Sequence, residues 1–168
     1  MRYAQIRELD ISNGEGIGVA LFVQGCPSPH CKNCFNPETW DFNDGRTFTN
    51  VEKEKIIELA NKDYIVGLSI LGGEPLHPNN IETVANICKC FKQKYPNKTI
   101  WLWSGFRYED ILNRENNYDI LNLIDILVDG QFEIDKKDLN LKWRGSSNQR
   151  VIDCKKSLLE NKIILKED

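Results

Sequence analysis

The pattern of apolar and polar positions predicts four short, buried β-strands. Continuous apolar runs occupy residues 17–23, 65–71, 99–103 and 125–128, and each is followed by glycine or a polar turn. Short runs rich in β-branched and aromatic residues, without polar alternation, are typical of strands buried on both faces of a sheet. Residues 4–11 are expected to form a further strand or an extended arm, and residues 150–152 a strand near the end of the chain.

Helical patterns separate these strands. Thr49 and Glu52 have the spacing of a capping box, which predicts a helix over residues 50–62 with Thr49 as its N-cap. Apolar residues at a period of 3.6 predict a second helix over residues 80–95. Shorter helices are expected over residues 108–113 and 118–124. The alternation of strand and helix predicts an α/β fold whose mostly parallel strands are joined by right-handed crossovers.

The length of the chain limits how far such a sheet can close. A complete eight-stranded barrel takes about 250 residues, whereas this chain has 168. We therefore expect a partial, open (β/α) barrel, formed by residues 1–168 as a single domain. Functional groups of parallel α/β folds lie at the carboxyl ends of the strands. The loops expected to line one rim are the cysteine-rich segment after residue 23, Gly72-Gly73-Glu74-Pro75, Ser104-Gly105 and Asp129-Gly130.

Composition and charge narrow the class of protein. Hydrophobic residues make up 40% of the chain and charged residues 28%, which is typical of globular proteins. The net charge of −3 gives no general attraction to nucleic acid or to an anionic membrane. Neither a signal peptide nor a run of about 18 apolar residues is found, so we expect a cytoplasmic protein. There, the six cysteines are expected to be metal ligands or free thiols.

Three of these cysteines, Cys26, Cys31 and Cys34, lie within nine residues directly after the first buried strand. Thiolates are soft ligands that suit zinc and iron–sulfur clusters. Closed zinc sites take four ligands, and cubane clusters usually take four cysteines. Three ligands therefore predict a metal centre with one position open to a substrate or cofactor. His30 is the nearby candidate for a fourth ligand, and it leaves zinc, or unligated thiols, as alternatives.

The loop after the second buried strand is the next candidate for chemistry. Gly72 and Gly73 either make a simple turn or let a ligand approach the backbone closely, and Glu74 could receive an ammonium group. Phe35, beside Cys34, could fill the interior or stack on a purine ring. We expect His77 to be a hydrogen-bonding turn residue rather than a base.

The remaining three cysteines are assigned no function. Cys88 and Cys90 point about 200° apart on a helix and cannot comfortably share a metal. Cys88 lies on the apolar face of its helix, where a core thiol is expected, and Cys154 stands alone.

Several segments together resemble radical S-adenosylmethionine proteins, and more closely the activating proteins of anaerobic (class III) ribonucleoside-triphosphate reductase. The resemblance covers nearly the whole chain. Its most specific parts are Gln-Gly-Cys at 24–26, Cys-Phe-Asn-Pro-Glu-Thr-Trp at 34–40, Leu-Gly-Gly-Glu-Pro-Leu-His-Pro at 71–78 and Arg-Gly-Ser-Ser-Asn-Gln-Arg-Val-Ile at 144–152.

The resemblance implies a 4Fe–4S cluster on Cys26, Cys31 and Cys34, whose fourth iron binds the amino and carboxylate groups of S-adenosylmethionine. It implies that one electron from a low-potential donor cleaves the sulfonium to methionine and a 5′-deoxyadenosyl radical. That radical takes hydrogen from a glycine of the partner reductase.

The resemblance also implies where the cofactor lies. Residues Gly72, Gly73 and Glu74 would lie along the methionine amino group, and Asn33 and Phe35 near the adenosyl part. Ser104 and Asp129 are expected to complete the cofactor-binding rim. On this interpretation Gly73→Val keeps the cluster and blocks the approach of the cofactor.

One departure from the family and two alternatives bear on this interpretation. The family spacing is C-x3-C-x2-C, whereas this chain has C-x4-C-x2-C. One extra residue changes loop-closure entropy little, but Pro27 and Pro29 restrict where the loop can bulge. The alternatives are a small-molecule radical enzyme similar to 7-carboxy-7-deazaguanine synthase and a non-catalytic iron–sulfur or zinc-binding module. No obvious extra region encloses a small substrate, which favours a protein substrate.

Overall fold

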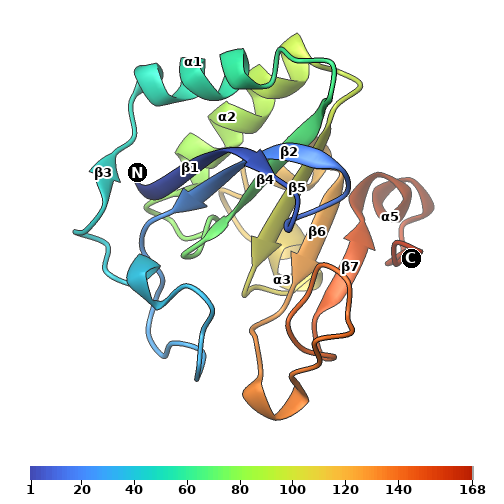
Figure 1. Cartoon of the computed structure of the whole chain (residues 1–168). Helices are drawn as coiled ribbons and strands as arrows, with labels where there is room; N and C mark the ends of the chain where they lie inside the picture. The colour runs from blue at the N-terminus through green and yellow to red at the C-terminus, as the bar shows by residue number, and fades with distance from the viewer. Residues whose placement is uncertain (168) are drawn as a thin grey trace.

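The structure is a computed structural model that describes residues 1–167, and it confirms the predicted open α/β arrangement (Figure 1). Its four central strands are β2 (Ile17–Val23), β4 (Ile65–Gly72), β5 (Thr99–Ser104) and β6 (Ile126–Asp129), and neighbours among them are parallel. Three antiparallel strands flank them, namely β1 (Arg2–Asp10), β3 (Arg46–Thr47) and β7 (Arg150–Asp153). The sheet order is β3-β1-β2-β4-β5-β6-β7, so β3 and β7 are the outermost strands and the sheet does not close.

The helices cover one face of this sheet. They are α1 (Asn50–Leu59), α2 (Ile81–Lys94), α3 (Tyr108–Asn113), α4 (Ile120–Leu123) and α5 (Cys154–Glu160). Two short 3-10 helices, η1 (Pro37–Thr39) and η2 (Ile134–Lys136), lie in loops. All five α-helices contribute buried side chains to the same core cluster. None of the helices within residues 1–167 is long and apolar enough to cross a membrane.

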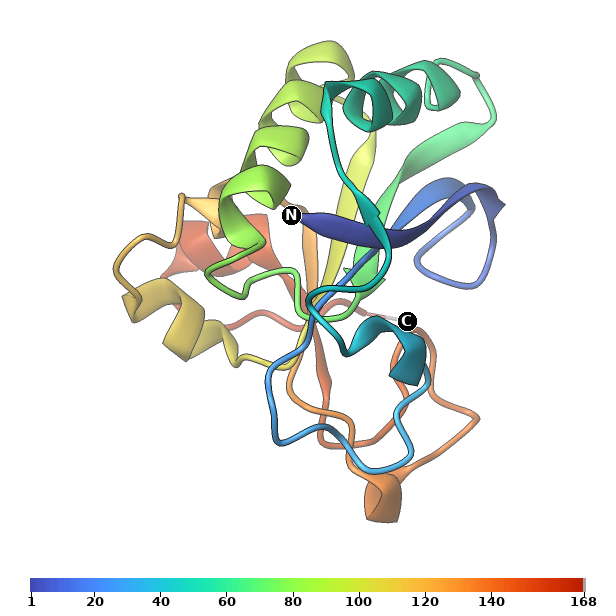
Figure 2. The ribbon, with the colours of Figure 1, turned by 90° about the vertical axis from the view of Figure 1, so that its left-hand side faces the viewer.

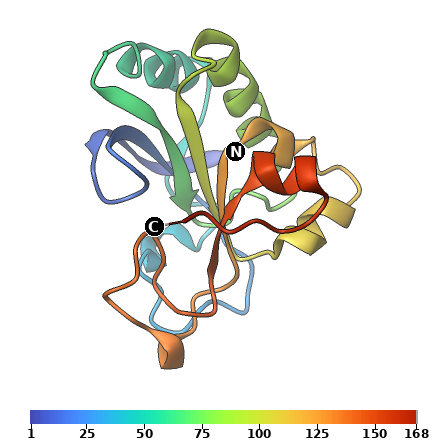
Figure 3. The same cartoon turned by 90° about the vertical axis from the view of Figure 1, so that its right-hand side faces the viewer.

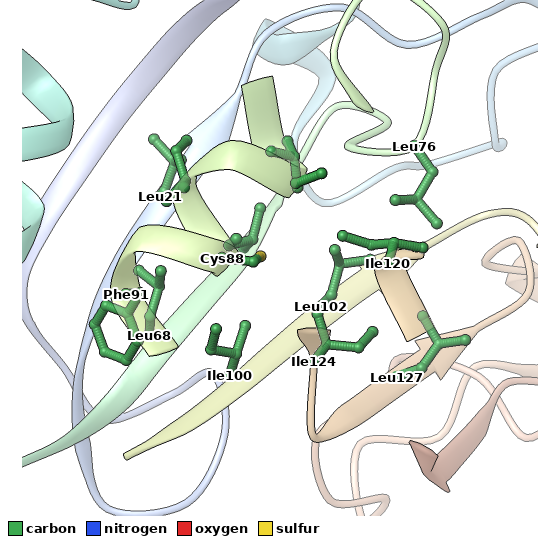
Figure 4. Close-up of a cluster of buried hydrophobic side chains, with 14 of the residues drawn as sticks. Leu21, Leu68, Leu76, Cys88, Phe91, Ile100, Leu102, Ile120, Ile124 and Leu127 are labelled. Carbon is green, nitrogen blue, oxygen red and sulfur yellow. The ribbon is translucent and has the colours of Figure 1, made fainter. Parts of the chain in front are cut away.

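Strand alternation separates the helix-covered core from the opposite face. Figure 4 shows strand side chains meeting Cys88 and Phe91 of α2 in the main core, and the strand residues that it labels are Leu21, Leu68, Ile100, Leu102 and Leu127. Trp101 and Val128 alternate with these residues and point to the opposite face, where they form a second apolar cluster. The four central strands are therefore buried on both faces, as their continuous apolar runs predicted.

Most predicted elements are confirmed, but α1 ends earlier than its sequence pattern predicts. The predicted helix extends to residue 62, but α1 ends at Leu59 with Ala60 as its C-cap. The Lys98 ammonium group donates hydrogen bonds to the carbonyl oxygens of Ala60, Lys62 and Ile65, at 2.7, 2.9 and 2.7 Å. Lys98, directly before β5, thus satisfies the carbonyl oxygen of the C-cap residue Ala60 and ties the end of the helix to the start of β4. The apolar pattern of residues 50–62 does not predict this contact with Lys98.

Two further differences concern the last third of the chain. The helix expected over residues 118–124 is reduced to α4, because Tyr118 and Asp119 adopt positive φ angles of 51° and 56° that are incompatible with a right-handed helix. Helix α5 was not predicted. Its N-cap is Asp153, whose carboxylate accepts a hydrogen bond from the Lys156 backbone N–H at 2.9 Å.

Candidate metal and cofactor site

A cavity of about 590 Å³ opens at the carboxyl ends of the four parallel strands. The loops after β2, β4, β5 and β6 all contribute to its wall, and residues 131–149 supply much of the remainder. In both Figure 2 and Figure 3 the cysteine loop and the segment after β6 extend from the same end of the sheet. The predicted meeting of the four loops at one rim is therefore observed.

The three clustered cysteines all line this cavity and all have free thiols. Their loop is anchored at its start, where the Gly25 and Cys26 backbone N–H groups donate to the carbonyl oxygens of Thr39 and Trp40 at 2.8 and 3.0 Å. The buried Gln24 side-chain amide donates to two further carbonyl oxygens of the same segment. These bonds hold the two ends of the loop together, so that the thiols between them face the cavity.

The surroundings of the thiols disfavour their charged form when no metal is bound. Burial raises the pKa of the Cys26 thiol to about 12, and the nearby Glu74 carboxylate adds to this shift. Burial also raises the pKa of Cys31. Iron supplies the positive charge that stabilises thiolates in such a place, because a coordinated thiol is deprotonated outright. The Asn36 backbone N–H also donates to the Cys34 sulfur, at 3.4 Å.

The donor set fits an iron–sulfur cluster better than a closed zinc site. Among residues 1–167, no three Cys, His, Asp or Glu side chains are placed to share a single metal ion. His30, the candidate fourth zinc ligand, is held elsewhere: its Nε2 lies 3.0 Å from the Cys26 carbonyl oxygen, and its ring stacks on Trp40 at 4.1 Å. A cubane cluster binds each cysteine through a different iron atom, so its ligands stand farther apart than those of zinc.

The glycine pair after β4 packs directly against the cysteine loop. The Glu74 backbone N–H donates to the Gly25 carbonyl oxygen at 2.8 Å. A Cβ atom at Gly73 would lie 2.4 Å from the Gly25 carbonyl oxygen and 3.0 Å from that of Thr39. The missing side chain is thus required by the contact between two loops. The expectation that Gly73→Val keeps the cluster stays untested, but this close contact gives a reason to expect that a side chain at Gly73 also disturbs the cysteine loop.

We accordingly expect Gly73→Ala to bind much less iron than the wild type after anaerobic reconstitution. The added Cβ would collide with the backbone of the loop that carries the cysteines. Gly105→Ala is the matched control, because a Cβ there would meet only side-chain atoms, at 3.2 and 3.3 Å. Iron and sulfide analysis of both variants is the measurement. Full iron in Gly73→Ala with a weakened response to S-adenosylmethionine would restore the simpler interpretation.

Glu74 is a buried carboxylate, 4% exposed, that joins two of the loops. One oxygen accepts hydrogen bonds from the Leu76 backbone N–H and the Ser104 hydroxyl, at 2.9 and 2.8 Å, and the other accepts from the Gly105 N–H at 2.8 Å. Burial raises the pKa of Glu74, while these bonds oppose the shift. No described cation forms an ion pair with it, so the carboxylate keeps capacity for a positively charged ligand.

Two predicted cofactor residues lie outside the cavity wall. The Asp129 carboxylate is fully buried on the side of α3, where it accepts hydrogen bonds from the Tyr108 N–H at 2.8 Å and from Arg150 Nε at 3.0 Å. Side chains alternate along a strand, so the cavity is lined by Gly130 instead. Asn33 is exposed, with a φ of 57°, and does not line the cavity.

Phe35 lies on the cavity wall beside residues that sequence reasoning did not single out. Its ring centroid is 4.9 Å from that of Phe132, and a Cβ at Gly145 would be 2.6 Å from its edge. The segment that follows β6 thus packs onto the cysteine loop. Trp143 and Arg144 also line the cavity. The sequence analysis marked residues 144–152 as a specific part of the family resemblance but assigned no role to Trp143 or Arg144.

The residues left without a function lie elsewhere. Cys88 and Cys154 are fully buried, and burial raises the pKa of the Cys88 thiol to about 12. The expected core role of Cys88 is confirmed, and Cys90 does not line the cavity. His77 is confirmed as a turn residue, because its Nδ1 accepts a hydrogen bond from the Asn79 N–H at 3.2 Å.

The open sheet carries three free thiols on a cavity at its edge, a donor set that suits an iron–sulfur protein. In agreement, the model of a family described as "4Fe-4S single cluster domain" matches residues 12–152. The chain belongs to the family of anaerobic ribonucleoside-triphosphate reductase-activating proteins. Proteins of that name from Salmonella typhi, Enterobacteria phage T4 and Escherichia coli K12 are 42%, 40% and 39% identical to it over 153 residues. The matches cover 90% of this chain and 97%, 93% and 97% of those proteins, respectively.

Proposed function

We propose that this protein activates an anaerobic ribonucleoside-triphosphate reductase by generating a glycyl radical on it. Cys26, Cys31 and Cys34 would hold a 4Fe–4S cluster. The observation that carries the proposal is the placement of these three free thiols on the wall of a cavity of about 590 Å³. The names of the relatives support the choice of partner.

A 4Fe–4S cluster held by Cys26, Cys31 and Cys34 would pass one electron from a low-potential donor to S-adenosylmethionine. Its reductive cleavage would yield methionine and, after a hydrogen atom is taken from a glycine Cα of the reductase, 5′-deoxyadenosine and the glycyl radical. A primary-carbon radical abstracts hydrogen readily, so the site must hold its cofactor firmly and exclude water and competing donors.

The residues of the chain have separate tasks in this proposal. Glu74, buried and without a cation partner, receives the ammonium group of the cofactor. Phe35 offers an aromatic face for the adenine, since every base has a face that can stack. Trp103 and Phe132 line the same cavity and limit access of water to it. The Gly73 contact with Gly25 keeps the cysteine loop in register with the Glu74 loop.

The mouth of the cavity suits a protein substrate. Phe35 is 57% exposed and Leu139 83% exposed, and both lie on the cavity wall. Exposed apolar residues around an opening are typical of a surface that a partner covers. A loop of the reductase that presents a glycine can approach closely, because glycine has no side chain.

The test combines the reduced, iron-loaded protein, S-adenosylmethionine and the reductase without oxygen. We expect a doublet signal of a glycyl radical in the electron paramagnetic resonance spectrum, together with 5′-deoxyadenosine. If 5′-deoxyadenosine forms equally without the reductase and no glycyl signal develops with it, the substrate is a small molecule. If iron binds but S-adenosylmethionine is never cleaved, the protein is a non-catalytic module.

A further inference from the structure

We infer that Arg144 binds the carboxylate of the amino-acid end of the ligand in the cavity. The inference rests on the proposed function, because it takes S-adenosylmethionine as that ligand. Arg144 lines the same cavity as the three cysteines and Glu74.

The Arg144 guanidinium group has no partner of its own. It forms no hydrogen bond or ion pair with any of residues 1–167, and its Nε is buried without an acceptor. The other arginine that lines the cavity, Arg7, is paired with Asp10 at 3.3 Å. A buried donor without an acceptor is costly, and most so in a charged group. The unmatched guanidinium therefore indicates an anion that arrives with the ligand.

The backbone on both sides of Arg144 is fixed. The Trp143 carbonyl oxygen accepts a hydrogen bond from the Trp103 indole N–H at 2.8 Å, and the Trp143 indole N–H donates to the Gly14 carbonyl oxygen at 3.1 Å. On the other side, the Gly145 backbone N–H donates to the side-chain oxygen of Gln149 at 2.9 Å. Arg144 is thus presented to the cavity from a braced turn, which reduces the entropy lost when it binds an anion.

Charge complementarity identifies the anion as a carboxylate. The cavity contains one buried carboxylate without a cation, on Glu74, and one guanidinium without an anion, on Arg144. The amino-acid end of S-adenosylmethionine, with an amino group that donates hydrogen bonds and a carboxylate on one carbon, can satisfy both groups at once. The planar guanidinium matches a carboxylate with two parallel hydrogen bonds, which a lysine cannot reproduce.

The test compares S-adenosylmethionine with its decarboxylated analogue on the iron-loaded protein. Affinities are measured by equilibrium dialysis for the wild type, Arg144→Gln and Arg144→Lys, with iron content as the check on loading. We expect Arg144→Gln to weaken S-adenosylmethionine about tenfold to a hundredfold, the effect of losing charge-assisted hydrogen bonds, and Arg144→Lys to restore part of that loss. Binding of the decarboxylated analogue is expected to change little in either variant.

The matched control is Lys142→Gln, which removes a positive charge from the same segment. Lys142 is exposed, does not line the cavity and should keep the wild-type affinity for S-adenosylmethionine. A carboxylate of the reductase would present the same chemistry, so the affinity of each variant for the reductase is also measured without the cofactor.

Each result decides the assignment. If Arg144→Gln lost affinity equally for S-adenosylmethionine and its decarboxylated analogue, or lost affinity for neither, the assignment would be overturned and the proposed function would remain intact. A loss confined to reductase binding would identify the carboxylate as one of the partner and overturn the cofactor assignment. If the wild type binds no S-adenosylmethionine at all, both the proposed function and the role of Arg144 fail.

Discussion

Replacing Cys26, Cys31 or Cys34 singly with alanine should abolish the stable four-iron cluster. On the proposed assignment each change removes one of three protein ligands, and the His30 ring, stacked on Trp40, is not placed to take over. Iron and sulfide content after anaerobic reconstitution, with the absorption of the cluster, is the measurement.

The remaining three cysteines provide the matched controls. Alanine at Cys88, Cys90 or Cys154 removes a thiol that lies outside the cavity wall. Iron content in these variants should stay near that of the wild type, although the loss of a buried sulfur at Cys88 or Cys154 costs some stability. Full iron in Cys31→Ala, or its loss in Cys154→Ala, would show that the ligands have been wrongly assigned.

The second large effect is expected at Asp129. Its carboxylate is fully buried and paired with Arg150 from β7, while Arg107 lies 3.6 Å away and the Tyr108 N–H donates to it at 2.8 Å. Removing the carboxylate leaves the Tyr108 N–H without its acceptor and takes one partner from Arg150, which keeps Glu109, and the typical cost of such a loss is about 1–3 kcal/mol. We therefore expect Asp129→Ala to lower the free energy of unfolding by roughly this amount, measured by urea denaturation.

An exposed ion pair gives the control for this prediction. Glu160 and Lys162 are 2.9 Å apart, with side chains 46% and 64% exposed, and such surface pairs contribute only about 0–1 kcal/mol. Glu160→Ala should therefore change stability little. An Asp129→Ala variant as stable as Glu160→Ala would contradict the prediction. It would show that the network around Arg150 contributes little to holding β6, β7 and α3 together. A variant that keeps its stability but loses the cofactor would instead place Asp129 in the binding machinery.

Arg150 shows how this network reaches the site. Besides Asp129, it donates hydrogen bonds to both carboxylate oxygens of Glu109, and together they lower the pKa of Glu109 to about 2. Nearby, Arg107 donates to the Asn148 carbonyl oxygen at 3.1 Å, within the segment that carries Arg144. The Asp129 network is thus connected through Arg107 to the segment that carries Arg144.

Local sequence rules were sufficient for most elements. The apolar runs predicted β2 without error, and the capping box gave the start of α1, where the Thr49 side chain and Glu52 are hydrogen-bonded as expected. These features depend on neighbouring residues alone. The end of α1 was missed because Lys98, far away in the sequence, caps it. The start of α5 was missed because its only local signal is one N-cap residue, Asp153.

The candidate site was predictable where reactive residue types directly follow the carboxyl end of a parallel strand. Three cysteines after one strand, and Gly-Gly-Glu after the next parallel strand, must meet, because the carboxyl ends of parallel strands share one edge. The same rule failed for Asp129. The rule predicts that the end of a strand lies at the rim, but it does not predict toward which face of the sheet the last side chain points. Register decides the face, and a shift of one residue reverses it.

By itself, the sequence determined the strand–helix order, the open sheet and the three-thiol centre, because these follow from short apolar periods and from ligand chemistry at fixed spacing. Only the tertiary structure decided that Gly73 makes room for Gly25 and that Arg144 enters the cavity without an acid partner. Both features depend on contacts between segments that are far apart in the chain, and a local sequence pattern does not predict which distant segment a residue will contact.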